Sequence, residues 1–67
     1  MKPYNFQTLD EICKQCHGLY NDGEDYLGVT FNNYADMHAF MKSSLYRILR
    51  PYRILSRYTK YLYFRFA

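Results

Sequence analysis

Large aromatic rings set the strongest limit on how this chain can fold, because nine tyrosines and five phenylalanines lie within only 67 residues. Disordered segments are poor in aromatic residues, so this density predicts a folded protein. A chain of this length forms one domain, and such a small core rarely contributes more than about 3–5 kcal/mol to stability. We therefore expect a single domain over residues 1–67, with some tyrosines in the core and others on a recognition surface.

Charge divides the chain into two parts. Residues 1–41 hold two lysines against six carboxylates, whereas residues 42–67 hold seven basic residues and no acid. This asymmetry bears on partners and association rates and not on the fold. Two interpretations are open: either the basic part faces an anionic partner, or it packs beside the acidic part and the charges neutralise each other.

A first helix is indicated over residues 8–19. Thr8-Leu9-Asp10-Glu11 matches a capping box, in which the Thr8 hydroxyl and the Glu11 carboxylate each satisfy a free backbone N–H group. Apolar side chains then recur at helical spacing as far as Leu19 and Tyr20. Gly18 or the turn-forming cluster Asn21-Asp22-Gly23 would end the helix.

A second helix is predicted to begin after Asn33, which is a favourable N-terminal residue. Pro51 has no backbone N–H and disfavours helical geometry at the residue before it, so this helix should end near residue 49. The expected core stripe consists of Tyr34, Met37, Met41, Leu45 and Ile48.

Two segments show the alternation of a strand. In residues 25–31, Leu27, Val29 and Phe31 share one side. Residues 60–66 are rich in strand-forming residues, whereas residues 52–58 fit either a strand or a helix. In the second strand Leu62, Phe64 and Phe66 should face the core, with Tyr61, Tyr63 and Arg65 on the opposite side.

These elements predict an α+β fold, in which two helices pack on a small two- or three-stranded antiparallel sheet. The alternative is a mostly helical chain with a kink at Pro51, because residues 48–66 also fit a helical period.

The segment Cys13-Lys-Gln-Cys16-His17 has the C-x-x-C-H pattern and resembles, over these five residues only, the haem attachment site of cytochrome c. Zinc is another possible ligand, because the two thiols with His17 or His38 would supply three tetrahedral ligands; the other histidine or an acid such as Asp22 or Asp36 would be the fourth. No second spaced pair follows, however, and cysteines three residues apart share one face of a helix. We expect core cysteines and no metal or cofactor.

The C-terminal segment carries the candidate binding site, because its cations alternate with tyrosines. Cations attract phosphates, tyrosine rings stack on bases, and tyrosine with arginine is also typical of protein–protein interfaces. The expected partner- or nucleic-acid-binding residues are Arg47, Arg50, Arg53, Arg57, Tyr58, Lys60, Tyr61, Tyr63 and Arg65.

Without a nucleophile–base pair or a glycine-rich phosphate loop, we expect a binding protein and no enzyme. The first hypothesis is a modulator or inhibitor that docks on a larger protein or nucleoprotein; in size and composition the chain resembles small phage proteins that take over host machinery. The alternatives are single-stranded DNA or RNA binding, or a zinc or haem protein. No signal peptide and no apolar run above four residues are seen, so we expect a cytoplasmic protein that does not bind a membrane. A homodimer formed through a sheet edge is a further hypothesis.

Overall fold

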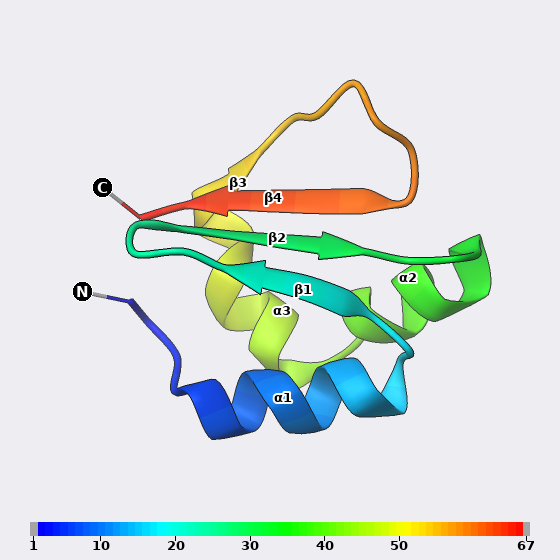
Figure 1. Cartoon of the computed structure of the whole chain (residues 1–67), viewed down its shortest axis with the longest axis horizontal. Helices are drawn as coiled ribbons and strands as arrows, with labels where there is room; N and C mark the ends of the chain where they lie inside the picture. Colours follow the sequence, from blue (N-terminus) through cyan, green and yellow to red (C-terminus); the bar gives the residue numbers. More distant parts are fainter. Residues whose placement is uncertain (1, 67) are drawn as a thin grey trace.

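The computed structural model describes residues 2–66 and has an α+β fold with three α-helices and a four-stranded antiparallel sheet (Figure 1). The predicted α+β class is confirmed, although one further helix and additional strands are present. The mostly helical alternative is wrong, because the C-terminal segment is a strand. In chain order the elements are α1 (Phe6–Gln15), β1 (Leu19–Asp22), β2 (Tyr26–Thr30), α2 (Tyr34–Met41), α3 (Ser44–Leu49), a 3-10 turn (Arg50–Tyr52), β3 (Arg53–Ile54) and β4 (Tyr61–Arg65).

Helix α1 begins earlier than the capping box predicts. The side chain of Asn5 accepts a hydrogen bond from the Thr8 N–H at 2.8 Å, so Asn5 and not Thr8 is the N-cap. The helix ends at Gln15, since His17 adopts a left-handed φ of 56°. The predicted extension to residue 19 is therefore wrong, and the chain turns directly into β1.

Strands β1 and β2 form a hairpin that the sequence did not indicate. Tyr20 lies opposite Val29 and Asp22 lies opposite Leu27. In the connecting turn the ring of Tyr26 lies across Gly23, where a Cβ atom would be only 2.0 Å from a ring carbon. Glycine is therefore needed here for close approach rather than for an unusual φ.

The predicted second helix is divided into α2 and α3. Ser43 separates them: its hydroxyl donates to the Phe40 carbonyl at 2.6 Å and accepts from the Tyr46 N–H at 3.2 Å. Helix α3 ends at Leu49, as expected, but Arg50 before Pro51 keeps helical backbone angles (φ −50°, ψ −43°), and the chain continues through Pro51 as the 3-10 turn. The break changes which residues reach the core. Tyr34 and Ile48 of the predicted stripe are about half exposed, while Phe40, Leu45 and Leu49 are fully buried.

The strand order is β1-β2-β4-β3, with β2 and β4 at the centre. Helices cover one face of this sheet, and no helix of residues 2–66 lies on the other face (Figure 1). The undecided segment 52–58 forms the end of the 3-10 turn, the short strand β3 and part of the β3–β4 loop. The core between sheet and helices consists of Leu9, Cys13, Cys16, Leu27, Val29, Phe31, Phe40, Leu45, Tyr46, Leu49, Leu62 and Phe64. Within residues 2–66, no helix has the length and apolar character needed to cross a membrane.

Candidate functional site

The sheet face that points away from the helices is rich in tyrosine. Pairing fixes which residues it contains: Leu27 and Val29 on β2, and Leu62 and Phe64 on β4, are buried toward the helices, so their neighbours point outward. We call this outward surface the tyrosine face; it consists of Leu19, Asn21, Tyr26, Gly28, Thr30, Ile54, Tyr61, Tyr63 and Arg65. Arg65 is the single charged residue among these strand positions.

Three tyrosine rings lie side by side on this face. The rings of Tyr61 and Tyr63 are nearly parallel, at an angle of 19° with centroids 6.4 Å apart. The Tyr26 ring lies 6.0 Å from that of Tyr63. A Cβ atom on Gly28 would be 2.4 Å from the Tyr61 hydroxyl oxygen, so the Tyr61 ring lies flat across β2. Burial, followed by the neighbouring Tyr63, raises the pKa of Tyr61 above its ordinary value.

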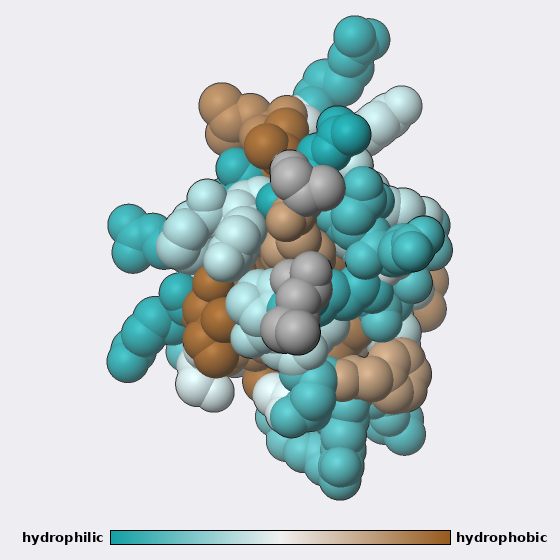
Figure 2. All heavy atoms as spheres, turned by 90° about the vertical axis from the view of Figure 1, so that its left-hand side faces the viewer, coloured by the Kyte–Doolittle hydropathy of each residue, from teal (hydrophilic) through white to brown (hydrophobic). Residues whose placement is uncertain are grey.

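Exposed apolar side chains border the tyrosines. Leu19 is 71% exposed at the β1 edge and Ile54 is 47% exposed at the β3 edge. In the β3–β4 loop Leu55 is 88% exposed, and the exposed ring of Tyr58 stands edge-on to Tyr61 at 6.1 Å. Figure 2 shows hydrophobic side chains gathered near the top of the view, at the end of the molecule that carries the β3–β4 loop in Figure 1.

The structure divides the predicted binding residues between two surfaces. Tyr61, Tyr63 and Arg65 lie on the tyrosine face, and Tyr58 adjoins it. Arg57 and Lys60 lie in the β3–β4 loop. Lys60 extends its ammonium group to 5.6 Å from the Tyr34 ring centroid.

The remaining predicted residues lie on the helix side of the sheet. Arg47 is part of α3 and Arg50 follows it directly. Arg53 lies opposite Phe64 in the register, and its guanidinium group donates to the Tyr46 hydroxyl at 3.0 Å. The sequence therefore predicted a single binding site, but the fold divides its residues between the tyrosine face with its adjoining loop and the helix side of the sheet.

Sequence reasoning missed Leu19 and Ile54 as members of the tyrosine face, because it predicted neither β1 nor the pairing of β3. It placed Tyr26, Gly28 and Thr30 opposite the core side of residues 25–31 but did not connect them with Tyr61 and Tyr63. The pairing of β2 with β4 makes that connection. Alternation in both segments indicated which side chains point outward. Without the strand order, however, the sequence did not show that these side chains lie on neighbouring strands.

The basic half of the chain is not neutralised by the acidic half through close ion pairs. Within residues 2–66 the carboxylates form ion pairs with Lys2 and Lys14, and Asp36 contacts the His17 ring. None of the seven lysines and arginines after residue 41 has a carboxylate oxygen of these residues within 4.0 Å. Their charge is therefore available to a partner.

The two cysteines lie in the core on the inner side of α1 and at its end. Cys13 is 1% exposed and Cys16 is 6% exposed, and both are free thiols. Burial raises the pKa of Cys13 to about 12, and burial also raises that of Cys16. The exposed His17 ring points to Asp36 at 3.5 Å. No group of three or more metal-ligating side chains is brought together within residues 2–66, so His38 does not join the thiols.

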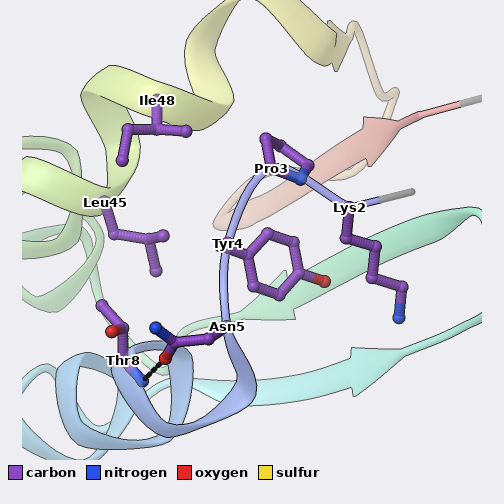
Figure 3. A pocket seen from close by; sticks show the side chains of 7 residues that line it. All are labelled: Lys2, Pro3, Tyr4, Asn5, Thr8, Leu45 and Ile48. Atoms are coloured by element: carbon purple, nitrogen blue, oxygen red, sulfur yellow. Dashed lines mark hydrogen bonds between the residues drawn. The ribbon is translucent and has the colours of Figure 1, made fainter.

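A cavity of about 410 Å³ lies between the N-terminal segment and α3. Figure 3 shows Leu45 and Ile48 on α3 facing the segment that carries Pro3 and Tyr4. The polar groups of this segment bind Asp22, whose Oδ1 atom accepts from Lys2 Nζ and from the Tyr4 hydroxyl, both at 2.6 Å. Burial and Asp22 raise the pKa of Tyr4 well above its ordinary value. These groups fasten the N-terminal segment to β1.

Comparison of the chain with protein-family models, with curated proteins and with solved structures finds no match. The proposed function therefore depends on the chemistry of the tyrosine face and of the basic residues on the helix side of the sheet.

Proposed function

We propose that the chain is a docking module that binds a larger protein through the tyrosine face and thereby modulates or inhibits it. The observation that carries this proposal is the group of Tyr26, Tyr61 and Tyr63, whose half-buried rings lie on the sheet face that no helix of residues 2–66 covers. Tyrosine is enriched at protein interfaces, whose centres are depleted of charge. Its ring supplies contact area at a low cost in side-chain entropy.

The composition of the face also indicates the chemistry of the partner. Leu19 and Ile54 at the two edges require an apolar surface opposite them, because large exposed aliphatic groups gain free energy when they leave water. The exposed Arg65 is suited to bind a carboxylate, which its planar guanidinium group holds through two parallel hydrogen bonds. The partner is therefore a protein with an apolar patch beside an acidic residue.

The test is affinity capture from the source cell followed by titration of the identified partner. The double variant Y61A/Y63A should lose the partner, since interface tyrosines that act as hot spots contribute about 2 kcal/mol or more each, which is about a 30-fold change in affinity. The matched control is Tyr34→Ala, because Tyr34 is an exposed tyrosine on α2 outside the face. Equal capture by both variants would exclude the tyrosine face as the docking surface.

Self-association is the competing use of the same face. Sedimentation at high protein concentration distinguishes self-association from docking on another protein. A monomer that captures a different protein supports the docking proposal, whereas a dimer abolished by Y61A/Y63A and no captured partner would replace it.

A further inference from the structure

A basic pocket lies where α2 meets α3, on the opposite side of the sheet from the tyrosine face. Its volume is about 310 Å³. Half of the residues that line it are cations, and no carboxylate is among the described ones. The lining consists of Met41, Lys42, Ser43, Tyr46, Arg47 and Arg50.

The cations of the pocket are free to bind an anion. Within residues 2–66, Lys42, Arg47 and Arg50 form none of the ion pairs. All three are exposed, so their charged groups face water. Arg47 on α3 and Arg50, which follows α3 with helical backbone angles, are three residues apart and therefore lie on the same side.

A fourth cation is fixed beside the pocket. Arg53 on β3 donates to the hydroxyl of Tyr46, and Tyr46 is only 8% exposed. The buried ring therefore holds the guanidinium group in place at the edge of the pocket. A positioned guanidinium group loses less entropy when it binds a planar or tetrahedral oxyanion.

These charges extend along the surface rather than converging on one point. Lys42 precedes α3 and Arg50 follows it, and the six residues of α3 rise by about 9 Å. A linear polyanion therefore matches the arrangement better than a single small anion. Three of the four cations are arginines, whose forked N–H groups match phosphate oxygens.

We propose that this pocket, with Arg53 at its edge, binds the phosphates of a nucleic-acid strand. The contacts go to the backbone, so binding depends on salt and not on base sequence. The proposal uses none of the residues of the tyrosine face and does not rest on the docking function. A chain with both surfaces would bring its protein partner to nucleic acid, or would dock on a nucleoprotein at two places.

The test measures fluorescence anisotropy of a labelled twelve-nucleotide thymidine strand as a function of salt. With three or four phosphate contacts, the slope of log K against log salt concentration should be about −2 to −3. The variant R47A/R50A should make the slope less steep by about 1.4. If the intercept at 1 M salt is unchanged, the affinity at 50 mM salt then falls about 60-fold.

The matched control is R57A/R65A, which removes the same net charge from the loop and the tyrosine face. It should weaken binding less than about threefold. A polyglutamate chain of equal length should bind much more weakly than the strand, because its charges lie at the ends of flexible side chains that lose entropy on binding, whereas the phosphates are part of the backbone. The proposal is overturned if the strand does not bind at 50 mM salt, if the control loses as much affinity as R47A/R50A, or if polyglutamate binds equally well.

Discussion

Asp22 fastens the N-terminal segment to the sheet, and its replacement by asparagine should measurably destabilise the fold. Its carboxylate binds Lys2 and Tyr4, and the Lys2 and Asp22 side chains are only 24% and 19% exposed. Asparagine keeps an acceptor for Tyr4 but removes the charge that binds Lys2. A hydrogen bond to a charged group contributes about 1.5–3 kcal/mol. Partial contact with solvent lowers the expected loss to about 1 kcal/mol, which corresponds to a decrease in Tm of about 4–8 °C.

The loss should depend on pH with a definite sign. Desolvation alone would raise the pKa of Asp22, but the hydrogen bonds from Lys2 and Tyr4 outweigh it and lower the pKa below the ordinary 3.8. A carboxylate with a lowered pKa stabilises the fold above its unfolded pKa, and this stabilisation disappears as the pH falls through the folded value. The difference between wild type and D22N should therefore be constant from pH 7 to pH 5 and should shrink as the pH falls below 3.8 and through the lowered pKa of the folded state.

Thermal unfolding followed by circular dichroism from pH 7 to pH 2 measures both effects. The control is Asp10→Asn, because Asp10 also accepts from a tyrosine and a lysine, Tyr20 and Lys14, but at the surface of α1. Asp10→Asn should lower Tm by less than D22N. The reasoning is refuted if D22N melts within 2 °C of wild type at pH 7, or if the difference does not shrink between pH 5 and pH 2.

Two further predictions concern the tyrosine face and the core. Gly28→Ala should lift the Tyr61 ring away from β2, because the added methyl group collides with the end of that flexible side chain. The pKa of Tyr61 should then fall toward 10, while the free energy of unfolding changes by less than about 1 kcal/mol. Carbon-13 NMR titration of the tyrosine Cζ atoms measures this pKa. An unchanged pKa would mean that the ring does not lie across Gly28. In native buffer at pH 8, Cys13 and Cys16 should react with a thiol reagent at least about tenfold more slowly than in guanidinium chloride. Thiolate is the reactive form, and burial of both thiols raises their pKa and blocks the reagent. Fast reaction of either thiol in native buffer would contradict its burial.

The strands at the centre of the sheet were predictable because their side chains alternate between the core and the outer face. The alternation in residues 25–31 and 60–66 correctly predicted which side chains point toward the core, and therefore that Tyr61 and Tyr63 point outward. Edge strands give a weaker signal, because they are short and only partly buried. Leu19–Asp22 has just two inward residues and contains Asn-Asp, which is also typical of a turn.

Long-range contacts account for most of the other differences. The helix break at Ser43 is a local exception: its hydroxyl binds Phe40 and Tyr46, yet a serine between the stripe residues Met41 and Leu45 fits a continuous helix equally well by spacing. Phe40 and Leu49 lie outside the predicted core stripe but are fully buried in the core. Likewise, the separation of Arg53 from Arg65 depends on which side of the sheet each residue faces, and this is set by pairing.

The strand order also determines when the tyrosine face comes into existence during folding. The β1–β2 and β3–β4 pairs join neighbouring segments, so each can form locally. The β2–β4 pair brings Thr30 together with Tyr61 and must close a loop that contains α2 and α3. Closing such a loop costs entropy that non-local contacts repay only afterwards, so we expect it to be the late step. Tyr26 and Tyr63 come from opposite sides of this junction, and only a fully folded chain can therefore present them together.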